Sequence, residues 1–168
     1  MCIRDSSSPV QAYGPTSYVT TWKTDNLTAG SSATNQIAIP VFGVTGDPGY
    51  NFEVLWGDGC SDQIVSGGSP AINGDIVHTY DGTCTTTYVN DGGLGVFTIT
   101  PISGVSSSSG DGTYTVEIDN QFPRIYFAGG NDKAKLLSVD QWGDINWAHL
   151  SNSYNGLCLL YTSPSPRD

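Results

Sequence analysis

A glycine-rich turn and four aspartates are the first candidates for chemistry in this chain of 168 residues. Asp58 lies in the segment Trp56-Gly57-Asp58-Gly59, and a calcium site could add three further aspartates, Asp62, Asp47 and Asp81. Calcium takes about 6–8 oxygen ligands, and the chain has no EF-hand spacing. The glycines permit positive φ angles, and an aspartate in a turn can accept backbone N–H bonds. We therefore expect a structural turn with Trp56 in the core, and Asp58 and Asp62 stay weaker calcium candidates.

His78 is the candidate for acid–base chemistry and lies between a strand valine and Tyr80. A catalytic base needs a nucleophile and an orienting acid within reach. No serine lies in a Gly-x-Ser-x-Gly elbow. We expect His78 to be a hydrogen-bonded structural residue, and we predict no catalytic site and no cofactor.

Cys60 and Cys84 form an even pair once the two terminal cysteines, Cys2 and Cys158, are set aside. A disulfide between them would stabilise the fold by on the order of 3 kcal/mol in the chain-entropy model and would agree with an extracellular location. The alternative is two free thiols. A zinc site is disfavoured, because only two of the four cysteines are left once the terminal pair is set aside and the two histidines are distant in sequence.

The two ends of the chain read as translated sequencing adapter. Residues 1–6 back-translate to ATG TGT ATA AGA GAC AG, and the reverse complement of that string encodes Cys-Leu-Leu-Tyr-Thr, the sequence of residues 158–162. We expect residues 1–6 and 158–168 to be adapter artefact, residues 7–17 to be a linker and the natural segment to be a fragment spanning about 7–157.

The composition limits the class of protein. The formal charge is −10 and only six residues are basic, so the chain has few cations that could neutralise the phosphates of a nucleic acid. With 21 Gly and 9 Pro and few strong helix formers, an all-helical protein is excluded. Aromatic residues make up 11% and hydrophobic residues 38%, which is enough for a core. No apolar run approaches the roughly 20 residues of a membrane span.

Short runs of β-branched and aromatic residues between Gly/Asp turns predict an all-β sandwich. In residues 36–42, Pro40 favours an edge strand or a strand end. In residues 50–56, period-two alternation places Tyr50, Phe52, Val54 and Trp56 on one face. Residues 146–154 read as a helical or irregular turn. The expected strands are 18–22, 36–42, 50–56, 62–65, 75–80, 113–118, 122–127 and 135–139, with a hairpin of 85–90 and 96–102 around Asp91-Gly92-Gly93.

Three strings resemble PKD-like domains, which are Ig-like β-sandwiches: Trp56-Gly57-Asp58-Gly59, His78-Thr79-Tyr80 and Gly112-Thr113-Tyr114-Thr115-Val116. Three more are similar to BspA-type leucine-rich-repeat surface proteins of bacteria, namely residues 18–24, residues 122–127 and the run 135–143 that contains Trp142. The resemblance implies an Ig-like/PKD-like sandwich over 18–127 with an insertion at 81–111. It also implies a truncated first leucine-rich repeat, or cap, over 128–157.

The resemblance implies a non-enzymatic module of a bacterial cell-surface or secreted protein. The module would space or cap the adjacent leucine-rich repeats and support adhesion, with a host or cell-surface protein or glycan as partner. The alternative is a carbohydrate-binding accessory module of a secreted hydrolase, with Tyr88 and Phe97 in the insertion stacking on sugars. These two rings could equally form a small core of the insertion itself.

Overall fold

The computed structural model describes residues 14–66, 71–104, 106, 108–127, 132–148, 150 and 153–154. This part of the chain contains nine β-strands in two antiparallel sheets and no helix, which confirms the predicted all-β sandwich. Residues 1–13 and 158–168, which include both predicted adapter segments and most of the predicted linker, lie outside the described residues. The strands are β1 (Tyr18–Lys23), β2 (Gln36–Gly43), β3 (Asn51–Leu55), β4 (Cys60–Ser66), β5 (Ile72–Thr79), β6 (Thr85–Asn90), β7 (Phe97–Gly104), β8 (Thr113–Gln121) and β9 (Leu136–Gln141).

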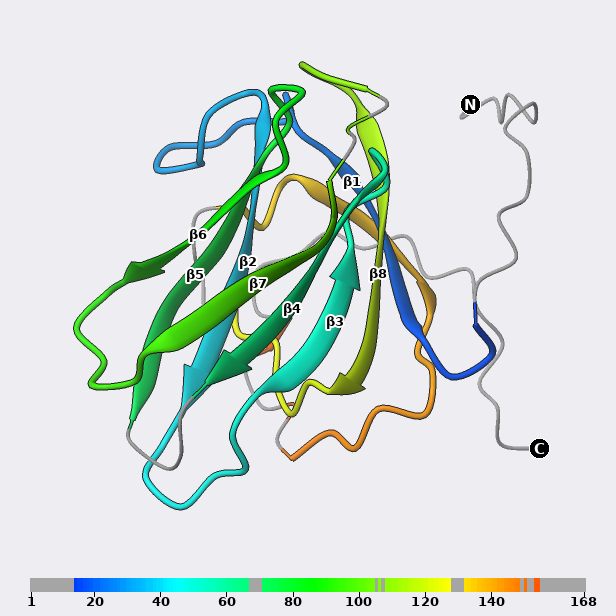
Figure 1. The fold of residues 1–168 in the computed structure, drawn as a ribbon. Coiled ribbons are helices and arrows are strands. Elements are labelled where there is room, and N and C mark those ends of the chain that lie inside the picture. The colour runs from blue at the N-terminus through cyan, green and yellow to red at the C-terminus, as the bar shows by residue number, and fades with distance from the viewer. Residues whose placement is uncertain are drawn as a thin grey trace.

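The larger sheet has the strand order β7-β4-β3-β8-β1-β9, and the smaller sheet has the order β2-β5-β6 (Figure 1). Side chains from both sheets form one buried cluster, so the two sheets pack face to face. Tyr50, Phe52, Val54 and Trp56 are each at most 1% exposed, which confirms the predicted inward face of that segment. Pro40 lies in β2 at the edge of the smaller sheet, as its missing N–H requires. No helix long and apolar enough to cross a membrane occurs among the described residues.

The predicted hairpin between β6 and β7 is wrong, although both strands exist. β6 pairs with β5 in the smaller sheet, whereas β7 pairs with β4 in the larger one. The connection between them docks on the start of β5, because the N–H groups of Leu94 and Gly95 both donate to Ala71 O. A Cβ atom on Gly93 would lie 2.5 Å from Asn73 N, so the glycine permits this close approach. The segment 81–111 therefore adds an edge strand to each sheet.

The strand predicted at residues 122–127 is also wrong, since this segment is irregular. Pro123 lacks an N–H, and the segment makes isolated backbone bonds such as Tyr126 N–H to Pro40 O and Phe127 N–H to Ser153 O instead of a ladder. Phe122, Ile125 and Phe127 are buried all the same. The apolar alternation here reflects burial of a loop against the core.

The strand predicted at residues 135–139 exists as β9, and it pairs with β1. Residues 136–141 thus belong to the larger sheet of the sandwich itself. The described residues after β9 form turns and irregular structure, so the helical option for residues 146–154 finds no support in them.

The chain after β9 is fastened to the sandwich by aromatic side chains. Trp142 and Trp147 contact Tyr18 at ring-centroid distances of 5.9 and 5.0 Å. Trp147 also contacts Phe122 at 6.0 Å, and the hydroxyls of Tyr154 and Tyr18 are hydrogen bonded at 2.8 Å. Such ring pairs contribute about 0.5–1.5 kcal/mol each beyond the area they bury. The segment that follows the last strand is therefore held against β1.

A buried ion pair fixes the loop before β2 to the segment before β9. Lys135 is fully buried, and its Nζ donates to Ser32 O, Ser32 Oγ, Ala33 O and Gln36 O at 2.7–3.1 Å. Asp132 lies 3.5 Å from the ammonium and accepts the N–H groups of Ser32 and Ala38. Burial lowers the pKa of Lys135, and the neighbouring Asp132 opposes that shift. Because every polar group in this contact is satisfied, the charges are tolerated in the interior.

Candidate functional site

The turn between β3 and β4 is held by a glycine and by a side-chain hydrogen bond. Gly57 has a φ of 83°, and a Cβ atom there would lie 2.4 Å from Thr115 O, so only glycine fits. Asp58 Oδ1 accepts the N–H of Cys60 at 2.9 Å, which closes the turn. Trp56 is fully buried, and its carbonyl oxygen accepts the hydroxyl of Tyr80.

His78, from β5, lies inside the sandwich against this turn. Its imidazole stacks on the indole of Trp56, with centroids 4.5 Å apart and planes 7° from parallel. Nδ1 lies 2.8 Å from Thr86 Oγ1, and Nε2 lies 3.2 Å from Asp58 Oδ2. The ring of Tyr80 contacts the imidazole of His78 and stacks on the ring of Tyr114, with centroids 3.7 Å apart in the second pair. His78 is therefore a hydrogen-bonded interior residue, as expected.

The hydrogen-bond directions place a proton on Nδ1 of His78. The Thr86 hydroxyl has one proton and donates it to Asp62 Oδ2 at 2.6 Å, so it must accept from His78 Nδ1–H. Asp62 Oδ2 also accepts the indole N–H of Trp56 at 2.7 Å. The imidazole of His78 is thus linked through the hydroxyl of Thr86 to the buried carboxylate of Asp62.

The second nitrogen of His78, Nε2, lies 3.2 Å from Asp58 Oδ2. Burial of Asp58 would raise the pKa of its carboxyl, but hydrogen bonds from His78 and from the Cys60 N–H outweigh it and lower the pKa. Both side chains are fully buried. The carboxylate of Asp58 is therefore kept ionised by its partners.

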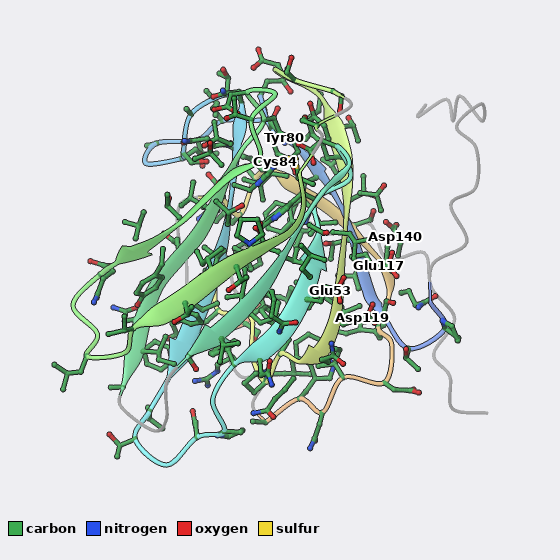
Figure 2. The ribbon with its side chains drawn as sticks, viewed as in Figure 1. Glu53, Tyr80, Cys84, Glu117, Asp119 and Asp140 are labelled. Atoms are coloured by element: carbon green, nitrogen blue, oxygen red, sulfur yellow. A yellow bond between two sulfur atoms is a disulfide. The ribbon has the colours of Figure 1, made fainter. Side chains whose placement is uncertain are left out.

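Cys60 and Cys84 form a disulfide in the structure, with Cα atoms 5.5 Å apart. Cys60 is 2% exposed, whereas Cys84 is partly buried at the same end of the sandwich as Tyr80 (Figure 2). Asp58 Oδ2 lies 3.2 Å from Cys60 Sγ. A disulfide sulfur carries no proton, so this is a contact between two potential ligand atoms. Donor atoms of Asp58, Cys60 and His78 all lie within 4.8 Å of one another.

The four aspartates considered for calcium do not form one set. Asp47 precedes β3 and accepts the N–H of Val44, whereas Asp58 follows β3 at its opposite end. Asp81 binds the backbone and hydroxyl of Thr83. Asp62 Oδ2 accepts two protein donors. Among the described residues, the one group with metal-ligand spacing is Asp58, Cys60 and His78, which sequence reasoning missed because His78 is distant in sequence.

Tyr88 and Phe97 pack on each other between β6 and β7. Their ring centroids are 4.6 Å apart, and Phe97 is 9% exposed. The hydroxyl of Tyr88 donates to Asn73 O. The rings join the two edge strands to the core, in keeping with the interpretation that they form a local core.

A second aromatic pair lies beside β2. Phe42 and Tyr126 are partly exposed and stack with centroids 4.5 Å apart. The guanidinium carbon of Arg124 is 5.2 and 5.1 Å from the two centroids, and its Nε has no hydrogen-bond partner among the described residues. A guanidinium at this distance from aromatic rings is attracted by their quadrupoles.

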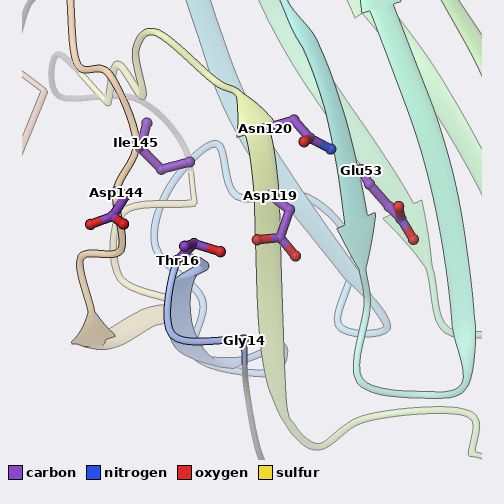
Figure 3. A pocket seen from close by; sticks show the side chains of 7 residues that line it. All are labelled: Gly14, Thr16, Glu53, Asp119, Asn120, Asp144 and Ile145. Atoms are coloured by element: carbon purple, nitrogen blue, oxygen red, sulfur yellow. The ribbon is translucent and has the colours of Figure 1, made fainter.

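A surface pocket of about 420 Å³ lies beside the middle of β3 and the last residues of β8 (Figure 3). Three carboxylates, Glu53, Asp119 and Asp144, line it together with Gly14, Thr16, Asn120 and Ile145. Figure 2 shows Glu53 and Asp119 on the same side of the larger sheet as Glu117 and Asp140. With no cationic side chain in its lining, the pocket has a negative potential. Alternation along β8 is the signal that could have found Glu117 and Asp119, since both lie opposite its inward face.

Comparisons with protein-family models, curated proteins and solved structures give no match for this chain.

Proposed function

We propose that the chain is a non-enzymatic β-sandwich module of a bacterial cell-surface or secreted protein of the BspA-like, leucine-rich-repeat kind. In this proposal the sandwich is PKD-like, and it spaces and caps the adjacent repeats, so that the parent protein can adhere to a host or cell-surface protein or glycan. Repeats of this type cannot bury their hydrophobic face alone and need a capped end.

The observation that carries this proposal is the aromatic attachment of the segment after β9. Tyr18 lies in β1, and its ring and hydroxyl contact Trp142, Trp147 and Tyr154. A chain that continues from such a segment would leave the sandwich in a fixed direction, as a cap or spacer requires. In the disulfide-bonded chain, Asp58, Asp62 and His78 form hydrogen bonds in a buried network that joins the two sheets, which supports the non-enzymatic part.

Backbone relaxation measured by NMR tests the attachment. We expect ¹⁵N order parameters at Trp142 to Trp147 that equal those of β1, near the 0.85 of a rigid backbone. Tyr18→Ala should lower them, whereas Tyr126→Ala, which removes a ring outside the cluster, should not. Values under about 0.6 in the unmodified chain would contradict a rigid spacer.

Adhesion is tested by coating beads with the chain and measuring their retention on immobilised host extracellular matrix. Retention above that of beads coated with heat-unfolded chain supports a direct part in adhesion. Equal retention limits the proposal to spacing and capping.

The second candidate is a carbohydrate-binding accessory module, and the pair of Phe42 and Tyr126 favours it. The two partly exposed rings suit a sugar that stacks on them, and the guanidinium of Arg124, which is 8% exposed, lies against both rings. A glycan array gives the test. Binding that is lost in Tyr126→Ala and kept in Tyr88→Ala supports this function, and an array without signal counts against it.

A further inference from the structure

We propose that Asp58, Cys60, His78 and Cys84 form a zinc site when the disulfide is reduced, so that the disulfide and the metal are alternative states of one site. This proposal is independent of the module's part in a repeat protein. It follows from the position of His78, which the fold brings from β5 to the turn that carries Asp58 and Cys60.

Two of the distances between donor atoms match the edges of a zinc tetrahedron, and all three donor atoms lie within 4.8 Å of one another. With Zn–N and Zn–O bonds of about 2.0–2.1 Å and Zn–S bonds of about 2.3 Å, tetrahedral edges measure roughly 3.3 Å from N to O and roughly 3.5 Å from S to O. In the structure, Asp58 Oδ2 lies 3.2 Å from His78 Nε2 and 3.2 Å from Cys60 Sγ. Both edges fit to within a few tenths of an ångström.

Cys84 supplies the fourth ligand once the S–S bond is broken. Its Sγ is bonded to that of Cys60, so it already lies beside the other donors. Two thiolates on one tetrahedral zinc lie roughly 3.8 Å apart, so the two sulfurs must separate. Cys84 is partly buried whereas Cys60 is buried, and we therefore assign the movement to Cys84.

The surroundings of His78 match those of a metal-binding histidine. Such a residue usually donates its second ring N–H to a fixed acceptor, which sets the tautomer and the ring orientation. Here Nδ1–H donates to Thr86 Oγ1, and that hydroxyl donates to Asp62 Oδ2. The indole of Trp56 holds the ring plane. Nε2 is left to face the other donors.

The change of state balances in electrons and protons. A dithiol reductant gives two electrons and two protons to the disulfide, which becomes two thiols while the reductant becomes a disulfide. Zinc then displaces one proton from each thiol and binds Nε2 and Oδ2 in their unprotonated forms. Two thiolates and one carboxylate carry three negative charges, and the divalent ion offsets two of them. Exchange with an added disulfide, which takes up two electrons and two protons and becomes two thiols, re-forms the Cys60–Cys84 bond and releases the metal.

Cobalt(II) titration of the reduced chain tests the proposal. The chain is reduced with a phosphine under argon and titrated with Co²⁺, whose visible bands report tetrahedral thiolate coordination. We expect one cobalt per chain, a thiolate charge-transfer band, and loss of the colour when zinc is added. The oxidised chain should give no such bands. If the reduced chain without metal loses its near-ultraviolet circular dichroism, we expect zinc to restore it.

Variants separate the ligands from their neighbours. His78→Ala and Cys84→Ser should abolish the tetrahedral spectrum, and Thr86→Val should lower zinc affinity by about 10–100-fold, as expected for a group that orients a ligand. Asp81→Asn is the matched control, since this exposed aspartate lies close to Cys84 in sequence but outside the ligand set. A reduced chain that keeps its fold and gives no cobalt spectrum would overturn the proposal. A spectrum that is equal in the oxidised chain, or unchanged in His78→Ala, would also overturn it.

Discussion

The indole of Trp56 lies flat on the imidazole of His78, with ring centroids 4.5 Å apart and planes 7° from parallel. One ring comes from the turn after β3 in the larger sheet, and the other from β5 in the smaller sheet. The contact therefore joins the two sheets of the sandwich next to the buried carboxylates of Asp58 and Asp62. The same two rings are also joined by hydrogen bonds. The indole N–H of Trp56 donates to Asp62 directly, and the imidazole of His78 is linked to Asp62 through the hydroxyl of Thr86.

His78→Gln should destabilise the fold more than Thr86→Val. The first change removes the stacked ring and leaves Asp58 without its strongest partner, for which we expect a loss of about 2–4 kcal/mol in the free energy of unfolding. The second leaves the Nδ1–H of His78 unpaired, for which we expect about 1–2 kcal/mol. Urea unfolding followed by tryptophan fluorescence gives both values. The reverse order would show that the ring is dispensable.

Gly57→Ala should be strongly destabilising, because the φ angle of 83° is unfavourable for alanine and the new Cβ would lie 2.4 Å from Thr115 O. We expect about 2–4 kcal/mol. Gly46→Ala is the matched control, since its φ is 101° and no atom lies within 4 Å of the new Cβ. It should cost only about 1 kcal/mol. Equal losses in thermal unfolding would mean that the close approach to β8 has no energetic role.

Strand positions could be predicted from the sequence to the extent that burial alternates. Residues 50–56 illustrate this, because one face is buried and the other is not, and a one-residue shift would reverse them. Pairing could not be predicted in the same way. β6 and β7 are separated by a short glycine-rich segment that reads as a hairpin, yet the contacts of Leu94 and Gly95 with Ala71 direct the two strands into different sheets.

The candidate site shows the same limit. The Trp56–Gly59 turn and the even pair of cysteines are visible in the sequence, and the conformation of the turn was predictable because glycine and aspartate act within a few residues. His78 lies 20 residues from Asp58 in the chain, so its contact with Asp58 depends on how β5 packs over β3. Local patterns carry no information on such a contact. The aromatic contacts of Tyr18 with Tyr154 were hidden for the same reason.

Lys135→Met should destabilise the fold by about 3–5 kcal/mol, since it leaves Asp132 buried without its cation and removes the donor to three carbonyl groups. The control is Lys23→Met, because Lys23 forms an exposed pair with Asp25 with side-chain exposures of 45% and 39%. Exposed pairs contribute about 0–1 kcal/mol. Thermal unfolding at one pH measures both variants. Similar unfolding midpoints for the two variants would show that the hydrogen bonds of Lys135 Nζ add nothing to stability.

Asp75→Asn should stabilise the fold at pH 7 and remove part of its pH dependence. Burial, together with the charges of Asp132 and Asp91, raises the pKa of Asp75 to about 6 in the folded state, against an ordinary value of 3.8. The folded chain then binds more protons at this group than the unfolded chain between pH 4 and pH 6. Its contribution to stability therefore rises as the pH falls through 6, and is complete below 4.

Urea unfolding of the unmodified chain and of Asp75→Asn from pH 4 to pH 8 checks this contribution. Other carboxyl groups titrate in both chains, so the difference between the two curves isolates Asp75. We expect Asp75→Asn to be more stable by on the order of 1–2 kcal/mol at pH 7, after screening by solvent, and the advantage to vanish near pH 4. Asp81→Asn serves as the control, because hydrogen bonds from Thr83 lower the pKa of this exposed carboxyl. Its difference from the unmodified chain should have the opposite slope with pH. An advantage of Asp75→Asn that stays constant from pH 4 to pH 8 would show that Asp75 ionises normally and that the gain comes from packing alone.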